Sequence, residues 1–497
     1  MIKQQQQSST GQLRLPPGPW RLPVIGSLHH LLGKPLFHRA MADLANRLDA
    51  PLMYLKLGEV PVMVATSPQA AREVMCTHEV TFASRPWSPT IKTIMTTYGQ
   101  GLVLPPYGNA WLRLRRASNL GLLSARRVQS FRHIREDEVG RLVTGIAAVP
   151  PGVPVNLSKR IAVLIADSTV RAIIGDRLTV ERREVFLETL EEKIKLDSGL
   201  SFGDLFPSSR MVNFICGTTR RALANHRKNL ELVDCAIKQH QKLRDAATLA
   251  GKGGAIKEEE EDDDDDFLDL LFRMQKDGGH DEPLTTGTIK ALILTSATTL
   301  QWAMSEVMRN PKVMKRAQDE LRHSLDGQTK VTEDDLAKLK YVKLIIKETL
   351  RLHPPGPLLL PRECGQLCKI VGYDVPKGTV MIINAWAISR DPKYWDDPEE
   401  FIPERFERGP IDFNKLRGDF DYIPFGAGRR MCPGILFAQV NIELALASLL
   451  FHFDWKLQPG LTPCELDMAE EMGITIRRKN DLQLHAIVRV PFESSTH

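Results

Sequence analysis

The stretch PFGAGRRMCPGILFAQVNIELALASLLFHF, residues 424–453, decides the fold expected for this chain of 497 residues. A glycine-rich loop with one cysteine, Cys432, runs directly into a long apolar helix. Because Pro433 and Gly434 follow at once, the sulfur lies just ahead of a helix N-terminus, where unpaired amides and the helix dipole stabilise a thiolate. The three glycines of the loop permit close approach of a flat ligand, and positive φ where it is needed. Arg430 lies two residues from the sulfur, within reach of a neighbouring carboxylate.

Five fixed positions fall within ten residues of this loop, which is more than short glycine motifs usually have. From Phe425 to Gly434 the chain reads F-x-x-G-x-R-x-C-x-G. The alternative is a glycine turn that caps a helix beside a buried cysteine. This alternative explains only some of the five fixed positions of the motif. The stretch resembles the cytochrome P450 superfamily, the haem-thiolate monooxygenases. The resemblance implies that Cys432 is the fifth ligand of the iron of haem b, and that its thiolate helps to drive O–O cleavage.

Two further segments match the family in order and spacing. Glu348 and Arg351 lie three apart on one helical face in LIIKETLRL, and Arg405 follows in the sequence PERF. Alone, the first pair would be an ordinary surface ion pair. The resemblance implies that the three side chains form a buried cluster that supports the haem loop and has no catalytic role.

Arginines elsewhere in the chain match the positions at which the family binds the haem propionates. Trp111 and Arg115 in NAWLRLRR match its W-x-x-x-R helix, and Arg362 and Arg430 fall where it places further donors. Arginine suits this task because its planar fork pairs with a carboxylate at two points. Each arginine alone could equally be a surface charge, so the expectation of propionate binding rests on the set.

Composition and periodicity indicate one large domain, mainly α with small β-sheets (α+β). The chain is 42% hydrophobic and 26% charged, and no linker separates two cores. Helical spacing dominates, and strands are expected near 51–67 (a hairpin about Gly58-Glu59), 369–380 and 482–490. We expect a polar leader at 1–14 without a membrane anchor and a haem-thiolate domain at 15–497, which includes an exposed acidic loop at 251–266. The resemblance implies that the haem lies between a long distal helix and the proximal cysteine loop.

The charge distribution favours an acidic partner. The formal net charge is +5 although residues 258–266 are nine consecutive acids, so the rest of the chain is strongly basic. Such a surface suits an acidic protein or anionic lipid. The sequence contains no basic stripe interleaved with aromatic residues, so a nucleic acid is a less suitable partner. The resemblance implies electron delivery by NADPH-cytochrome P450 reductase, docking around Arg115 and Arg116.

The stretch LILTSATTLQWAM, residues 292–304, departs from the family pattern. Relatives carry a small-residue groove and an acid before a threonine that delivers protons to bound oxygen. Aligned on SATTLQWAM, Thr295 takes the threonine position, Leu294 takes that of the acid, and about two helical turns, roughly eight residues, are missing. Three explanations remain: loss of a segment in processing or in the gene model, a helix that slides so that Ala297 and Thr298 rebuild a groove, or haem chemistry without oxygen activation. Packing alone accounts for Ser296 and Thr299.

The sequence of the Cys432 loop and the proline-rich segment LPPGPWRLPVIG, residues 15–26, most resemble the plant microsomal branch of the cytochrome P450 superfamily. The expected function is therefore NADPH-dependent hydroxylation of a lipophilic plant metabolite, with a terpenoid favoured, impaired by the shortened helix. The alternatives are a haem-dependent isomerase or dehydratase without a reductase, and an inert haem-binding remnant. The resemblance implies residence on the cytosolic face of the endoplasmic reticulum, with peripheral membrane contact after Phe202. Substrate contacts are expected in 87–103, 358–360 and 473–475, above all from Leu358, Leu359 and Ile474.

Overall fold

The alternating segment after Pro51 forms a β-hairpin in the computed structural model, which describes residues 13–98, 102–196, 201–228, 231, 286–407 and 420–492. Strands β1 (Leu52–Leu57) and β2 (Val60–Ala65) pair antiparallel, and their buried residues face the core. Gly58 makes the turn possible because it adopts a φ of +61°, which side-chain-bearing residues rarely reach. The hairpin predicted about Gly58-Glu59 is confirmed.

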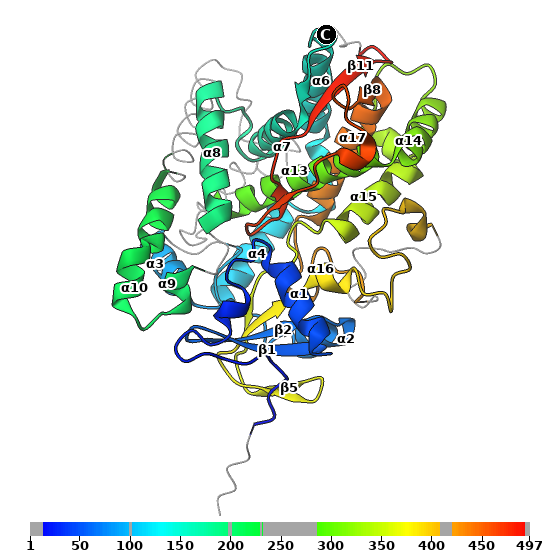
Figure 1. The fold of residues 1–497 in the computed structure, drawn as a ribbon. Coiled ribbons are helices and arrows are strands. Elements are labelled where there is room, and N and C mark those ends of the chain that lie inside the picture. Colours follow the sequence, from blue (N-terminus) through cyan, green and yellow to red (C-terminus); the bar gives the residue numbers. More distant parts are fainter. Residues whose placement is uncertain are drawn as a thin grey trace, which may run out of the picture.

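The hairpin is half of a four-stranded sheet that joins an N-terminal segment to residues 362–383. The strand order is β1-β2-β7-β4, with β7 (Val380–Ile383) parallel to β2 and β4 (Arg362–Glu363) antiparallel to β7. A small hairpin, β5 (Cys368–Ile370) and β6 (Tyr373–Val375), extends beyond it. In Figure 1 these blue and yellow segments lie together at the lower end of the molecule. The sheet therefore places Arg362 close to residues from the N-terminal part of the chain.

Two smaller sheets lie among the helices. One has the order β3-β11-β8 and consists of β3 (Val155–Asn156), β11 (Gln483–Val488) and β8 (Phe453–Lys456). The other pairs only β9 (Glu470–Glu471) with β10 (Arg477–Arg478). The strands predicted near 369–380 and 482–490 are thus present, although the first is divided into three short pieces.

Helices form most of the remaining described structure. The α-helices are α1 (Phe37–Arg47), α2 (Pro68–Arg72), α3 (Pro89–Tyr98), α4 (Asn109–Gly121), α5 (Ala125–Ser130), α6 (Arg132–Ala147), α7 (Leu157–Ile174), α8 (Val180–Leu196), α9 (Phe202–Leu205), α10 (Arg210–Cys216), α13 (Thr286–Arg309), α14 (Pro311–Ser324), α15 (Lys340–Leu352), α16 (Ala385–Ile388) and α17 (Ile435–His452). Short 3₁₀ or π turns are η1 (Leu28–His30), η2 (Glu73–Thr77), η3 (Glu333–Ala337), η4 (Pro403–Phe406), η5 (Gly428–Arg430) and η6 (Pro463–Glu465). The mainly α fold class with small sheets is confirmed.

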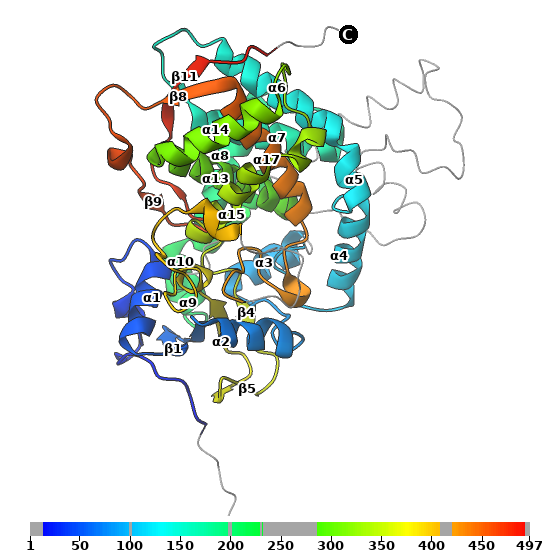
Figure 2. The same cartoon turned by 90° about the vertical axis from the view of Figure 1, so that its right-hand side faces the viewer.

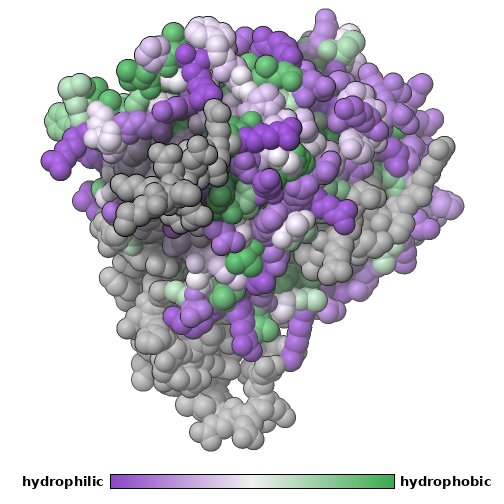
Figure 3. All heavy atoms as spheres, turned by 90° about the horizontal axis from the view of Figure 1, so that it is seen from below, coloured by the Kyte–Doolittle hydropathy of each residue, from purple (hydrophilic) through white to green (hydrophobic). Residues whose placement is uncertain are grey.

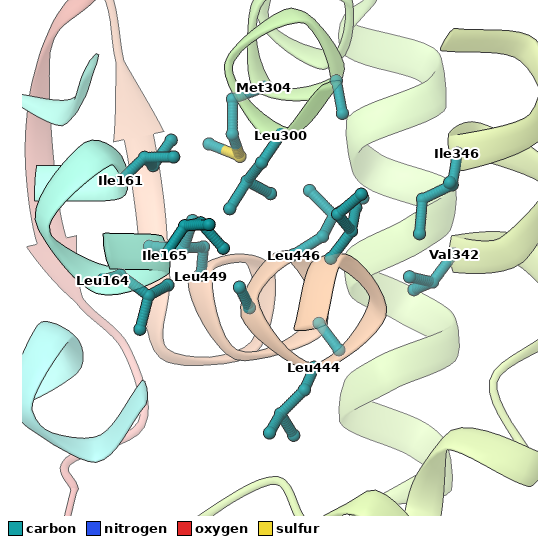
Figure 4. Close-up of a cluster of buried hydrophobic side chains, with 14 of the residues drawn as sticks. Ile161, Leu164, Ile165, Leu300, Met304, Val342, Ile346, Leu444, Leu446 and Leu449 are labelled. Atoms are coloured by element: carbon teal, nitrogen blue, oxygen red, sulfur yellow. The ribbon is translucent and has the colours of Figure 1, made fainter. Parts of the chain in front are cut away.

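The main core lies where α13, α17, α7 and α15 pack together. Figure 4 shows Ile161, Leu300, Val342 and Leu446, one from each helix, among the buried side chains that meet there. Helix α17 is long and apolar enough to cross a membrane, but 83% of that window is buried inside the molecule. Burial shows α17 to be a core helix (Figure 2).

Helices α13 and α14 follow one another, and some predictions lie outside the described residues. The two helices are separate because Pro311 lacks the N–H that would continue the hydrogen bonding of α13. The acidic loop at 251–266 and the first twelve residues of the leader fall outside the described ranges. Arg14 already belongs to the fold, since its amide donates to the carboxylate of Asp374 at 2.8 Å.

Candidate haem site

The loop before α17 is held in a tight fold by its glycines. The Cys432 amide donates to the Phe425 carbonyl at 3.1 Å, which closes the loop on itself. Gly428 has a φ of +68°, and a Cβ there would lie 1.9 Å from the Met75 carbonyl oxygen, so only glycine fits. Gly426 also has a positive φ, whereas Gly434 has a φ of −90° and serves as the N-cap of α17. Two glycines of the loop therefore shape its backbone, and the third begins the helix.

Cys432 sits at the end of this loop, three residues before α17 begins. Its side chain is partly buried. Burial raises the pKa of the Cys432 thiol, while the Gly434 amide and the charge of Arg115 act in the opposite direction. The groups that lower this pKa are the ones expected of a site that stabilises negative sulfur.

Four guanidinium groups surround the same loop. Each donates to backbone carbonyls: Arg115 to Met431 at 2.7 Å, Arg362 to Ala427 at 3.1 Å, Arg430 to Ala83 and Pro105 at 2.6 and 2.7 Å, and Arg85 to Leu360 and Pro361 at 2.7 and 2.9 Å. Trp111 stacks its indole 3.9 Å from the Arg430 guanidinium carbon and donates its N–H to the Leu102 carbonyl at 2.9 Å. The structure thus brings together all of the predicted propionate-binding residues, and adds Arg85.

Arg85, Arg362 and Arg430 are buried and Arg115 is half-buried, and none of the four forms an ion pair with a carboxylate among the described residues. Burial lowers the pKa of Arg362 to about 10 and, with the charges of Arg362 and Arg115, that of Arg430 to about 9. The pKa of Arg85 is also well below its usual range, through burial and the same positive neighbours. Buried donors on Arg85 (Nε), Arg362 (Nη1) and Arg430 (Nη1) have no acceptor. Buried unpaired cations are costly, so this cluster suits a ligand with carboxylates.

The predicted Glu–Arg–Arg cluster forms behind the loop. Glu348 receives two hydrogen bonds from Arg351, both at 2.8 Å, and one from Arg405 at 3.0 Å. The Glu348 and Arg351 side chains are fully buried. The Tyr422 hydroxyl, just before the cysteine loop, donates to the Lys347 carbonyl at 2.8 Å. Glu348 and Arg351 therefore tie α15 to the segment 389–402 that precedes the loop, through Ser389, Pro398, Glu400 and Ile402.

The family model that matches this chain is that of cytochrome P450, over residues 16–484. The chain belongs to the cytochrome P450 family. It is 43% identical to Zealexin A1 synthase of Zea mays (96% of this chain, 94% of the relative) and 43% identical to Desmethyl-deoxy-podophyllotoxin synthase of Sinopodophyllum hexandrum (97% and 94%). It is 41% identical to Premnaspirodiene oxygenase of Hyoscyamus muticus over 505 positions (100% and 96%). It is thus an oxygen-incorporating oxidoreductase of the plant P450 type.

P450 proteins bind haem b through a cysteine thiolate, and the residues found here fit that group. Haem b carries two carboxylates, and the cluster around Cys432 offers buried guanidinium donors that lack acceptors. When bound, the haem supplies the redox chemistry that activates oxygen. The chain supplies a thiol next to a helix N-terminus and a positive pocket beside it.

Replacing Arg362 with glutamine is expected to speed the loss of haem about tenfold or more. A hydrogen bond to a charged group contributes about 1.5–3 kcal/mol, and the orphaned Nη1 of Arg362 is free to make one. The transfer of haem to excess apomyoglobin measures the rate. Arg429→Gln is the matched control, because Arg429 pairs with Glu79 at the surface, at 2.9 Å. Equal rates for the two variants would remove Arg362 from the haem site.

Thr295 lies in the middle of α13, which runs without interruption from Thr286 to Arg309. Among the residues whose side chains are described, Thr295 is half-buried, and Thr298 is nearly fully buried. The Thr299 hydroxyl donates to the Thr295 carbonyl at 2.9 Å, the backward hydrogen bond typical of threonine in helices. Ser296 and Thr299 are therefore packing residues. The side chain of Leu294 and those before it in α13 lie outside the described set.

The three residues singled out for substrate lie in different surroundings. The Leu359 side chain is 3.7 Å from the position that a Cβ on Gly426 would take, so it borders the cysteine loop. Leu358 instead packs against the core formed by the sheet and α1. Ile474 is half-buried in the turn between β9 and β10. Leu359 is thus the one of the three with a contact to the loop among the described residues.

Arg85 was missed by the sequence analysis. It stands in TFASRP, between a helical turn and α3, with no local pattern that marks it as buried. In the structure it is 6% exposed, and its two acceptors immediately precede Arg362. A pre-proline arginine that follows a short apolar segment is a weak signal, because its burial depends on contacts with residues far along the chain.

Proposed function

We propose that this chain hydroxylates a lipophilic terpenoid, with Cys432 holding the iron of haem b and the guanidinium groups around it as partners of the haem carboxylates. The observation that carries the proposal is the set of buried arginines around the Cys432 loop, whose guanidinium groups keep donors without acceptors. It supports a resident dicarboxylate at that place. Among the relatives, Premnaspirodiene oxygenase is named for the oxygenation of a diene, which supports the choice of an apolar substrate.

The chain's own residues would divide the work around the haem. Arg85, Arg362 and Arg430 would neutralise the carboxylates and fix the orientation of the ring. Cys432 would hold the iron from the proximal side, and α13 would cover the distal side. Leu359, half-buried beside the cysteine loop, would offer an apolar wall to a substrate. An apolar wall favours lipophilic molecules and excludes water from the reacting centre.

We further propose that proton delivery is weak, because α13 is short of about two turns before Thr295. The alignment with Premnaspirodiene oxygenase spans 505 positions, eight more than the 497 residues of this chain. At least eight positions of that relative therefore lack a counterpart here, which agrees with the roughly eight residues that the sequence pattern lacks. With Leu294 in the position of the acid, Thr295 would act without its partner. Poor coupling of NADPH consumption to product is the expected consequence.

Turnover of a sesquiterpene diene by the purified protein tests this function. The assay contains the haem-loaded chain, a P450 reductase, NADPH and oxygen, with premnaspirodiene as the first probe. The proposal predicts a product heavier by one oxygen atom, formed only with both NADPH and oxygen, and in low yield per NADPH. Conversion of a lipid hydroperoxide without NADPH would instead favour the isomerase or dehydratase, for which the missing acid is the supporting observation. Haem binding without product from either assay would indicate an inert remnant.

P450 proteins generally receive electrons from a redox partner, and the proximal face here suits an acidic one. Arg116 is exposed on α4, as is Arg113, and Arg126 is exposed at the start of α5. Arg115, expected in the same role, is turned inward to the Met431 carbonyl. The docking face proposed for NADPH-cytochrome P450 reductase is therefore made by the exposed arginines beside Arg115.

Exposed apolar residues favour peripheral contact with a membrane, for which we propose the cytosolic face of the endoplasmic reticulum. Phe214 and Ile215 in α10 are 86% and 73% exposed, and Val24 is 80% exposed. Residues near both exposed groups are hydrogen-bonded to the β1–β2 turn. The Gly58 amide donates to the Ile25 carbonyl, and the Glu59 amide donates to the Leu205 carbonyl. In Figure 3, hydrophobic residues lie in separate patches among hydrophilic ones, a pattern that suits shallow insertion.

A further inference from the structure

The turn 472–476, which joins β9 to β10, has little structure of its own. Only two residue pairs connect the strands, Arg477 with Glu471 and Arg478 with Glu470. A two-stranded ribbon of this length is not stable alone, so its position must come from other contacts. The turn carries Ile474, one of the residues expected to touch substrate. What holds the turn therefore decides the shape of that part of the pocket.

Backbone contacts tie the C-terminal side of the turn to two helices. The Trp302 indole in α13 donates to the Ile476 carbonyl at 3.1 Å, and the Ile476 amide donates to the Pro355 carbonyl at 2.9 Å, just after α15. Arg478 donates to the Ser305 hydroxyl, also in α13, at 2.9 Å. The return strand is thus bound to the same helix that carries Thr295.

The N-terminal side of the turn is held by a buried carboxylate. The Glu470 side chain is 3% exposed and accepts a hydrogen bond at 2.9 Å from Arg39 of α1. His38 Nε2 lies 3.7 Å and His353 Nδ1 4.0 Å from its oxygens. Burial alone would raise the pKa of Glu470, but these three neighbours lower it to about 2. Glu470 is therefore a fixed negative charge between α1 and the end of α15.

His353 extends this contact to α13. Its Nε2 lies 2.7 Å from Glu306, and its ring stacks on Trp302 with centroids 4.1 Å apart and 4° between the planes. Arg39, Glu470, His353 and Glu306 therefore form a continuous line of charged and imidazole groups. It joins α1, β9, α15 and α13 across the base of the turn.

We propose that Glu470 is a positioning residue for substrate selection, because it holds the turn 472–476 to α1 and to the end of α15 and so sets the position of Ile474. The inference rests on the proposed function in one respect, the placement of Ile474 at the substrate. Removing the Glu470 charge leaves His38 and His353 buried without the carboxylate between them. The turn would then lose its attachment to α1 while keeping the Trp302 contact.

Azole binding tests the proposal without turnover. Imidazole coordinates haem iron and reaches little else, whereas 4-phenylimidazole also needs space in the pocket, and both give optical difference spectra. In Glu470→Gln we expect the affinity for 4-phenylimidazole to change about tenfold, which is near the upper range for mutations that act through a packed network. The affinity for imidazole should stay nearly unchanged. Glu471→Gln is the matched control, because Glu471 is adjacent, more exposed, and pairs with Arg477 of the same ribbon.

A second, milder pair of variants keeps the test open if Glu470→Gln does not fold. Arg39→Gln removes one hydrogen-bond donor to Glu470, and the Arg39 side chain is 48% exposed. Arg47→Gln on the same helix is its control, since Arg47 donates to the Asp43 carbonyl of its own helix. A smaller but selective change for 4-phenylimidazole in Arg39→Gln supports the proposal. Equal changes for both azoles, or no difference from the controls, would overturn it. Failure of terpenoid turnover would leave these affinities unaffected, so the two claims fail separately.

Discussion

Replacing Cys432 with serine is expected to abolish thiolate ligation, and with it the strongly red-shifted Soret band of the reduced carbon monoxide complex. A serine hydroxyl stays protonated near neutral pH, so neither the Gly434 amide nor Arg115 could hold an anion at this position. NADPH-dependent product formation should be lost together with the band. Optical spectra of the two reduced proteins under carbon monoxide make the comparison.

Cys464→Ser is the control for that substitution, since Cys464 is an exposed thiol at the surface. Its spectrum should match that of the unaltered chain. If Cys432→Ser instead kept the red-shifted band, another residue would have to be the ligand. The loop from Phe425 to Gly434 would then have a different role.

Inserting a groove-and-acid segment of about eight residues between Leu294 and Thr295 is expected to raise product per NADPH by about tenfold or more. General acid catalysis by a positioned side chain contributes about 10²–10⁴ in rate, and the shortened helix lacks the acid. Eight residues make about 2.2 turns, so residues before the insertion are rotated by about 80° relative to those after it. Product and NADPH are measured together, with premnaspirodiene as substrate.

The control for the insertion is a segment of equal length with the acid replaced by its amide. It restores the length of α13 and leaves proton delivery unsupported, so it should recover pocket shape without recovering coupling. A gain in both inserted proteins would assign the defect to packing. No gain in either would sink the argument that a segment is missing.

Local sequence patterns predicted the parts of the site that single segments determine. The turn at Gly58, the loop around Cys432 and the pair Glu348–Arg351 each follow from spacing within about ten residues. Resemblance to a family added the meeting of Arg405 with that pair, which composition alone does not show.

Contacts between distant segments explain what the sequence did not predict. Arg85 is buried only because the chain near Leu360 passes over it, some 275 residues later. Glu470 gains its partners from α1 and from the end of α15, so nothing near it in the sequence marks it. Arg115 and Arg116 were expected together at a docking surface, but helical geometry turns Arg115 inward and leaves Arg116 exposed.

The most direct test of the account is the carbon monoxide difference spectrum of the reduced, haem-loaded protein. A strongly red-shifted Soret band is predicted, because Cys432 would hold the iron as a thiolate while the surrounding arginines hold the haem. Such a band would also show that the pocket survives the shortened α13. An unshifted band, or failure to bind haem supplied in excess, would contradict the claim that this chain forms a working haem-thiolate site.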